Sequence, residues 1–295
     1  EVLDCFQTIE DMDCPSVILI DGICVGGGLE LALAFDRIIA IDDAVCQVGF
    51  PEINLGLLPG YGGSARACER MGPEGALQLV LHGRPLKARA ALAAGAVDHL
   101  VDDRDGLAQA AREAIAGTIA RATPTAADDL AGMIEAERAK LTARTSPRNM
   151  PAPFAILDHF SINDLSKNNL LKNETKLFSK LMMTPASAGL RRTFQLNDAV
   201  KKGARGDSGI IRIHVIGAGT MGGDIAAVAA MSGFSVTLQD LDPAAIDGAV
   251  ARAGVLYERR LKDPQRVADT LARLEADPDG AGLATADLVI EAVAE

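Results

Sequence analysis

The sequence predicts an α/β protein with two folded units joined by a helical linker, and three observations lead to this prediction. Short apolar runs alternate with helical patterns near both ends of the 295-residue chain, whereas the middle is polar and helical. Hydrophobic residues make up 48% of the chain and aromatic residues 3%, which excludes a wholly disordered chain and favours helix-rich α/β packing. A glycine-rich turn between a strand and a helix occurs late in the chain. A chain of this length can bury a core in each unit.

The first unit is predicted to span residues 1–121. Residues 17–20 and 37–41 are apolar runs of strand length, and residues 28–35 between them have a helical pattern. Gly95 is placed to end a later helix as its C-cap. Four further helices are predicted, at residues 62–71, 75–81, 88–94 and 107–121.

A polar linker is predicted over residues 122–207, and a second unit over 208–295. DDLAGMIEAERAKLTA suits a solvent-facing helix, TSPRNMPAP is a turn-rich break, and two more helices follow in NNLLKNETKLFSKLM and PASAGLRRTFQLNDAVKKG. KKGARGDSG then marks a boundary. In the second unit, strands at 211–216, 235–240 and 288–292 alternate with helices at 221–232 and 243–261, which is the order of a βαβ unit with a parallel sheet.

Charge and cysteine usage exclude several classes of protein. The net charge of -11 disfavours nucleic acid and anionic membrane surfaces as partners. The five cysteines all lie in the first quarter without a CxxC motif, which argues against a disulfide framework and a zinc site. The four histidines show no metal-ligand spacing either, so we expect no metal. No apolar run approaches the ~18 residues of a transmembrane segment. A reducing, cytoplasmic compartment fits best.

Two glutamates accompany a glycine-rich turn in the first unit. In IDGICVGGGLELALAFD, three glycines at 26–28 directly precede a helix whose first N–H groups are unpaired and can polarise a carbonyl oxygen. Glu30 lies in the first turn of that helix, and Glu52 follows 22 residues later in GFPEINLGLLPGYGG. Taken alone, these features also fit an ordinary strand-to-helix turn with surface carboxylates, or the paired carboxylates of a glycosidase.

Three stretches together are more specific: DGICVGGGLE, PEINLGLLPGYGGSAR and GRPLKARAALAAGAVD occur in this order. They resemble the crotonase (enoyl-CoA hydratase) superfamily, which implies a spiral of ββα turns and an acyl-CoA thioester substrate. By this resemblance, the Gly27 N–H is an oxyanion-hole donor for the thioester carbonyl, Glu30 is the base towards water, and Glu52 donates a proton to the α carbon. The presence of both glutamates favours a hydratase over an isomerase. The resemblance also implies that Gly62, Gly63 and Arg66 shape the neighbouring loop and helix, and that a second oxyanion donor lies upstream.

A dinucleotide fingerprint opens the second unit. In IHVIGAGTMGGDIAAVAAMSGFSVTLQDLD, a GxGxxG motif at Gly217, Gly219 and Gly222 follows a strand and opens a helix, and Asp240 ends the next strand. This context suits a pyrophosphate at the helix N-terminus and an acid on the ribose hydroxyls, and the acid favours NAD over NADP. A glycine-rich turn in an unrelated βαβ protein is the alternative. Thr220 and Met221 lie inside the motif.

IGAGTMGGDIA with the later DLVIEAVAE resembles the 3-hydroxyacyl-CoA dehydrogenase family, which implies a partial Rossmann fold, a doubly wound parallel sheet. The resemblance puts Ala292 and Glu295 on the nicotinamide side, and it puts the family's catalytic His–Glu pair further along than residue 295. His214 precedes the glycine motif inside a strand and is interpreted as a packing residue.

The succession of these two units resembles the multifunctional fatty-acid oxidation enzymes, in which a helix runs between the units. This implies hydration of 2-enoyl-CoA followed by NAD-dependent oxidation in the intact protein, and a thiolase subunit as a partner in a complex. The chain lacks an initiator Met and ends on a strand, so we expect a piece cut at both ends. A mitochondrial or peroxisomal compartment therefore stays open. The alternative function is a catalytically silent piece that binds NAD or packs within a complex.

Overall fold

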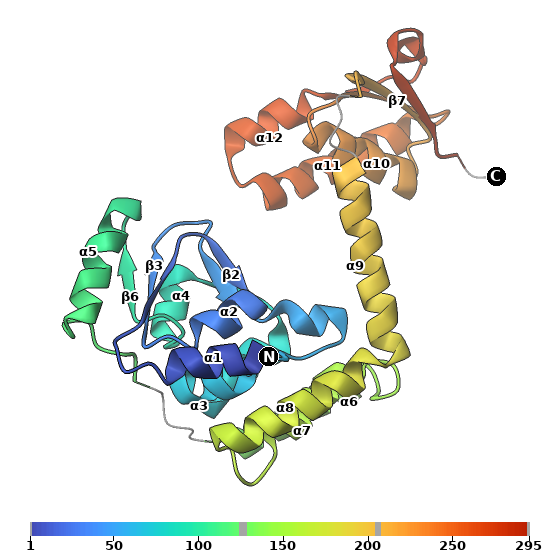
Figure 1. Ribbon diagram of the computed structural model, residues 1–295. Helices are drawn as coiled ribbons and strands as arrows, with labels where there is room; N and C mark the ends of the chain where they lie inside the picture. Colours follow the sequence, from blue (N-terminus) through green and yellow to red (C-terminus); the bar gives the residue numbers. More distant parts are fainter. Residues whose placement is uncertain (1, 124–128, 204–207, 294–295) are drawn as a thin grey trace. The chain divides into compact units, whose positions relative to one another are not determined.

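The computed structural model describes residues 2–123, 129–203 and 208–293, and it has the predicted α/β class (Figure 1). The chain divides into two units, Glu1–Lys201 and Lys202–Glu295. The domain boundaries predicted at residues 121 and 207 stay predictions. Within the described ranges, no helix is long and apolar enough to cross a membrane.

The first unit has two strand pairs that are each followed by a helix, and a third pair, β5 and β6, that is separated by α4; each pair contributes one strand to each of two sheets. β1 (Val17–Ile20), β3 (Arg37–Ile41) and β6 (His99–Val101) form one parallel sheet, with Leu19 opposite Ile39. β2 (Ile23–Val25) pairs in parallel with β4 (Gln47–Gly49), and β5 (Leu86–Lys87) adds to β4 in the antiparallel sense. The strands β2, β4, β5 and β6 were not predicted, since two or three residues are too few to show an alternating pattern.

Helices follow these strand pairs and cover the core. α2 (Gly27–Ala32) follows β2, and the short 3-10 helix η1 (Pro51–Leu55) follows β4. α3 (Gly63–His82) consists of two helical stretches separated by a kink at Gly72, whose backbone is not helical, in agreement with the two helices predicted at residues 62–71 and 75–81. α4 (Ala88–Ala93) ends before Gly95, as predicted, and α5 (Arg104–Ile115) begins at a capping Asp103.

Where the structure describes it, the segment predicted as a linker supplies four helices, and two of them belong to the core of the first unit. These helices are α6 (Leu130–Thr142), α7 (Pro151–Phe160), α8 (Lys167–Met182) and α9 (Pro185–Gly203). Ile156 and Phe160 of α7 and Leu181 of α8 are buried in one cluster with Leu29 and Phe50, and both helices pack against α3. α7 was not predicted, because it begins inside the turn-rich TSPRNMPAP, where Pro151 takes the first helical position.

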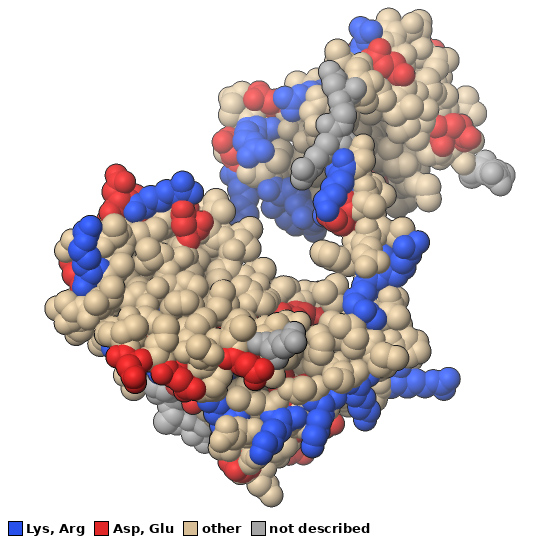
Figure 2. Space-filling view, in the orientation of Figure 1, with Lys and Arg blue, Asp and Glu red and all other residues tan. Residues whose placement is uncertain are grey.

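Helix α1 (Val2–Glu10) also packs on this unit and was not predicted. Figure 2 shows acidic side chains over α1 beside basic side chains over α8. Lys167 of α8 joins the two groups, since its Nζ lies 2.6 Å from a carboxylate oxygen of Glu10. Glu10 also accepts two hydrogen bonds from the buried guanidinium of Arg66 on α3, at 2.9 and 3.2 Å. α1 is therefore held to the start of α3 by charge as well as by apolar contact.

The second unit is a four-stranded parallel sheet in the order β10-β7-β8-β9, as the βαβ prediction requires. β7 (Arg212–Ile216) leads to α10 (Thr220–Met231), and β8 (Ser235–Gln239) leads to α11 (Pro243–Leu261). α12 (Pro264–Leu271), β9 (Leu274–Ala276) and β10 (Leu288–Glu291) follow. β7 lies between β8 and β10, so the loop after it stands where the strand order reverses, the usual ligand site of such sheets.

Candidate active site

The turn between β2 and α2 brings the two predicted catalytic carboxyl groups together. Gly26 has a φ of 58°, and its N–H donates to the carbonyl oxygen of Gly49 on β4 at 2.9 Å. A Cβ atom on Gly26 would lie 2.9 Å from Oε1 of Glu52, so this glycine is a close neighbour of that carboxyl group, and its positive φ favours glycine. Glu30 stands one helical turn later, since its N–H donates to the Gly26 carbonyl at 3.0 Å.

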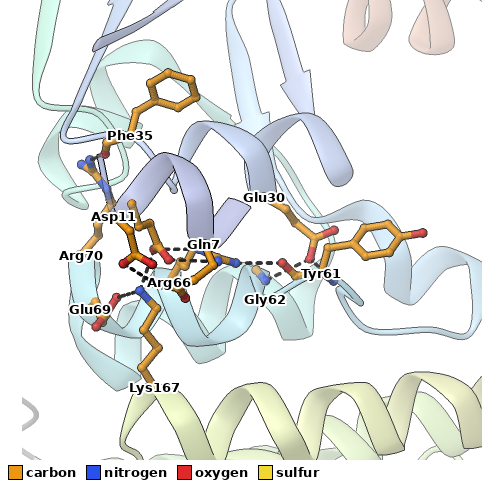
Figure 3. A network of polar contacts seen from close by, with 12 residues as sticks. Gln7, Asp11, Glu30, Phe35, Tyr61, Gly62, Arg66, Glu69, Arg70 and Lys167 are labelled. Atoms are coloured by element: carbon orange, nitrogen blue, oxygen red, sulfur yellow. Dashed lines mark hydrogen bonds and ion pairs between the residues drawn. The ribbon is translucent and has the colours of Figure 1, made fainter. Parts of the chain in front are cut away.

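Glu30 is 2% exposed and points from α2 towards the loop that precedes α3 (Figure 3). Its Oε1 accepts hydrogen bonds from the N–H groups of Tyr61 at 2.7 Å and Gly63 at 2.9 Å. Burial raises the pKa of Glu30 above its ordinary value, while these two amides and the charge of Arg66 oppose the rise. The amides therefore favour the ionised form of a carboxyl group that burial would otherwise neutralise.

Glu52 sits in a different environment at the start of η1. Among the described residues its Oε2 atom is buried without a hydrogen-bond partner. Burial raises the pKa of Glu52 to about 7, and the negative charge of Glu30 adds to the rise. Two neighbouring carboxyl groups thus differ: one is held by backbone donors, and the other has a free oxygen and a proton affinity near neutral pH.

Gly27 is the first residue of α2, so its N–H has no acceptor within the helix. A Cβ atom there would meet no atom within 4 Å, which leaves the backbone open to a ligand. The structure therefore brings Gly27, Glu30 and Glu52 around one turn. Arg66, which was expected to shape this region, is 1% exposed and donates to the carbonyl of Tyr61 at 2.8 Å (Figure 3).

Three buried polar residues beside Glu30 were not found from the sequence. Glu174 of α8 accepts hydrogen bonds from the N–H groups of Gly62 and Ser64, and Ser64 in turn contacts His159 of α7. Their signal in the sequence is weak, because they lie far apart along the chain. The sequence gives one indication of them: Glu174 lies on the apolar face of α8 with Leu170 and Leu181, where a charged residue is unusual.

The glycine motif of the second unit forms a close turn at the end of β7. Gly217 has a φ of 105°, and a Cβ atom there would lie 2.7 Å from the carbonyl oxygen of Ala292. Any side chain on Gly222 would overlap the carbonyl oxygen of Gly217. Beside Gly219, by contrast, a Cβ atom would meet nothing within 4 Å, so the start of α10 is open. This open helix N-terminus suits the pyrophosphate of a dinucleotide.

Asp240 lies at the end of β8 and accepts hydrogen bonds from the N–H groups of Ala218 at 2.6 Å and Asp242 at 3.0 Å. These bonds hold the pKa of Asp240 below its ordinary value, so the carboxylate is charged beside the glycine turn. Thr220 and Met221 are exposed at the first turn of α10. Glu295 lies outside the described residues. The donor set fits NAD, and His214 is buried in β7 against Thr237 at 2.8 Å, as a packing residue should be.

Two family models cover most of the chain. Residues 1–174 match enoyl-CoA hydratase/isomerase, and residues 212–295 match the NAD binding domain of 3-hydroxyacyl-CoA dehydrogenase. The first match spans more than half of the chain, which therefore belongs to the enoyl-CoA hydratase/isomerase family. Its second unit is an NAD-binding domain of the 3-hydroxyacyl-CoA dehydrogenase type.

Among curated relatives, the chain is similar to the fatty acid oxidation complex subunit alpha of Acinetobacter baylyi, at 35% identity over 317 residues, and of Acinetobacter baumannii, at 33% over 316. All of this chain is covered, but it spans 44% of each relative. Among solved structures, an enoyl-CoA hydratase from Mycobacterium avium shares 21% identity with a TM-score of 0.42, covering 66% of this chain and 69% of that one. A 3-hydroxybutyryl-CoA dehydrogenase from Escherichia coli shares 38% with a TM-score of 0.28, covering 29% and 19%.

Proposed function

We propose that the first unit carries a hydratase site that adds water across the α,β double bond of a 2-enoyl-CoA, within a longer protein of fatty-acid β-oxidation. One observation carries the proposal: Glu30 and Glu52 lie at the Gly26 turn in different environments, since Glu30 accepts from two backbone amides and Glu52 has a buried oxygen without a partner among the described residues. Membership of the hydratase/isomerase family supports the reaction class. The names of the curated relatives support the pathway.

Each carboxyl group has a role that its environment suits. Glu30, favoured as a carboxylate by the amides of Tyr61 and Gly63, accepts a proton from water as the water oxygen bonds to the β carbon. The π bond breaks, and Glu52 gives its proton to the α carbon. Net addition is one water molecule, and a proton passes from Glu30 to Glu52 before the next cycle. The N–H of Gly27 stabilises the thioester oxygen, on which negative charge develops.

The second unit is proposed to bind NAD for the following oxidation of the 3-hydroxyacyl-CoA in the longer protein. Bound NAD would accept the hydride in that step. Gly217, Gly219 and Gly222, with Thr220 and Met221, form the open turn for the pyrophosphate, and Asp240 is placed for the ribose hydroxyls. Ala292 borders the same turn on the proposed nicotinamide side, and Glu295 is assigned to that side by resemblance alone.

Partners and compartment follow as further proposals. The curated relatives are subunits of a complex, and a thiolase would consume the 3-oxoacyl-CoA product, so we assign a thiolase subunit as the partner. The five cysteines are unpaired, which supports a reducing compartment such as the cytoplasm.

The test is hydration of a 2-enoyl-CoA, followed by loss of absorbance of the conjugated thioester, for the 295-residue chain and for the longer protein. Glu30→Gln and Glu52→Gln should each lower the rate by roughly 100- to 10,000-fold. Glu135→Gln, on the exposed face of α6, should change nothing. Unchanged hydration in both active-site variants would refute the proposal. NAD binding without hydration in either protein would favour the alternative of a silent NAD-binding piece.

A further inference from the structure

The start of α3 is held by two carboxyl groups that bind alternate amides. Glu30 accepts from the N–H groups of Tyr61 and Gly63, at 2.7 and 2.9 Å. Glu174 accepts from those of Gly62 at 2.5 Å and Ser64 at 2.9 Å. Two acids therefore share four successive amides at the positive end of a helix dipole. Both side chains are almost fully buried, with 2% of Glu30 and 1% of Glu174 exposed.

Behind Glu174 lies a chain of hydrogen-bonding groups that leads away from Glu30. The Ser64 hydroxyl bonds to Glu174 and lies 2.8 Å from Nε2 of His159. The other ring nitrogen of His159, Nδ1, lies 2.9 Å from the side-chain amide of Asn173. Burial lowers the pKa of His159 to about 4, so the ring is neutral at pH 7. The Ser64 hydroxyl and the neutral His159 ring can each donate and accept, whereas the Asn173 amide nitrogen that faces Nδ1 only donates.

Such a chain can serve either charge state of Glu174. When Glu174 is ionised, the Ser64 hydroxyl donates to it and His159 donates to Ser64. When Glu174 is protonated, it donates to Ser64 and Ser64 donates to Nε2 of His159. Nδ1–H of the ring then needs an acceptor, which the Asn173 amide offers only after it flips to exchange its nitrogen for its oxygen. Neither arrangement leaves a net charge on Ser64 or His159. The O–H group of a protonated Glu174 therefore has an acceptor, so burial does not leave it without a hydrogen bond.

We propose that Glu174 is a positioning residue for Glu30: it fixes the turn whose amides hold Glu30, and the two acids carry one negative charge between them at neutral pH. The inference rests on the proposed hydratase function only for the role of Glu30 as base. Two like charges on one buried turn oppose each other. Each acid accepts from two amides, but the backbone of Gly60 and the charge of Arg66 also favour the ionised form of Glu30, so Glu174 is the member that keeps its proton.

The electrostatics agree with this assignment. Burial and the charge of Glu30 raise the pKa of Glu174 to about 8. Within the described part of the chain, the titratable groups around Glu174 are Glu30 from α2, Cys68 from α3 and, through Ser64, His159 from α7. Cys68 stays neutral, because burial and the neighbouring acids raise the pKa of its thiol to about 12. Glu30 is thus the group whose charge decides the state of Glu174.

The first test is a titration of the carboxyl carbons by NMR, on the 295-residue chain labelled with ¹³C at the glutamate side-chain carboxyl. Signals are assigned by their loss in Glu30→Gln and Glu174→Gln. Glu174 should titrate above pH 7, and Glu30→Gln should lower its pKa by at least about one unit. Glu135→Gln, which alters an exposed acid on α6, should leave it unchanged. A Glu174 that titrates near the ordinary glutamate value, or ignores Glu30→Gln, overturns the inference.

The second test compares two replacements in the hydration assay. Glu174→Gln imitates the protonated acid, so its hydration rate at pH 7 should stay within a few-fold of that of the unmutated protein. The change of the hydration rate near pH 8, where Glu174 titrates, should be absent in this variant. Glu174→Ala leaves two amides without acceptors, and should lower kcat more than KM, by roughly 5- to 150-fold. Equal losses in both variants would contradict a positioning role. A protein that titrates as expected but hydrates nothing overturns the proposed function and leaves the charge pair intact.

Discussion

Glu52 makes the stability of the first unit depend on pH. Its folded-state pKa of about 7 lies above the ordinary value of 4.5, so the unfolded chain releases this proton first as the pH rises. The unfolding free energy should therefore fall between about pH 4.5 and pH 7. Glu52→Gln removes this loss and should gain stability over the unmutated protein at pH 8, by up to on the order of 3 kcal/mol.

Urea unfolding of both proteins at pH 5 and pH 8 measures the difference. Glu135→Gln, an exposed acid on α6, should give the same curve as the unmutated protein at both pH values. Parallel pH dependence of Glu52→Gln and the unmutated protein would mean that Glu52 is not held in a raised-pKa environment.

Asp240 is the residue that we propose discriminates between the two nicotinamide cofactors by its charge. The unmutated protein should bind NAD in preference to NADP, and Asp240→Ala should weaken NAD binding by roughly 5- to 150-fold. Asp240→Asn is the informative control, because an amide oxygen can still accept from the N–H of Ala218 while the charge is gone. The Asp240→Asn variant should lose more of its selectivity for NAD over NADP than of its affinity for NAD. Calorimetry gives both constants, and equal binding of NAD and NADP by the unmutated protein would contradict the assignment.

The residues of the candidate site differ in how far the sequence predicts them. Gly27, Glu30 and Glu52 stand in motifs whose spacing can be read directly, and the structure brings them to one turn. Glu174 and His159 could not be predicted, since they reach Ser64 across 110 and 95 residues of chain. No local pattern records such a contact.

Among the secondary-structure elements, the length of an element and the Pro or Gly residues at its ends decide whether the sequence predicts it. β1, β3, α9 and α11 have the predicted bounds, because each is a run long enough to show its period or is bracketed by Pro or Gly. α3 was predicted as two helices because Gly72 and Pro73 usually end a helix, and Gly72 does interrupt it with a non-helical backbone. Strands of two or three residues depend on their neighbours in the sheet and leave no local pattern.

One buried ion pair ties α3 to the sheet of the first unit. Arg70 bonds to both carboxylate oxygens of Asp98, at 2.9 and 3.1 Å, and to the carbonyl of Phe35 at 2.6 Å, and neither side chain of the pair is exposed. Asp98→Ala would leave the guanidinium buried and unpaired, so we expect a loss of about 3–5 kcal/mol in unfolding free energy.

The matched control is Asp42→Ala, which removes an ion pair with Arg89, whose side chain is 85% exposed. That change should cost about 0–1 kcal/mol. Urea denaturation at constant pH measures both, and similar losses for the two variants would contradict the role of the buried pair.

At the scale of the whole molecule, the two units have separate hydrophobic cores. They should unfold in separable steps, and NAD should stabilise only the step of the second unit, by about 2.7 kcal/mol at a concentration one hundred times its Kd. The chain has no Trp and two Tyr, Tyr61 in the first unit and Tyr257 buried in the second. A Tyr61→Phe variant therefore makes tyrosine fluorescence report on the second unit alone.

Far-UV circular dichroism of the same variant follows both units during urea unfolding. NAD should shift the fluorescence transition, which reports on the second unit, to a higher urea concentration. The part of the circular dichroism transition that belongs to the first unit should stay at the same urea concentration. A single transition that shifts as a whole would show that the units unfold together.

Glu174 also sets the order in which the hydratase site can be completed during synthesis. A ribosome makes α2 and the start of α3 long before α8, so the nascent first unit has the amides of Gly62 and Ser64 without their acceptor until Glu174 emerges. Buried N–H groups without acceptors are unfavourable, and the turn that holds Glu30 should stay loose in that interval. We therefore expect α8 to complete the candidate site late in synthesis, and a chain released early would carry Glu30 and Glu52 without the turn that positions Glu30.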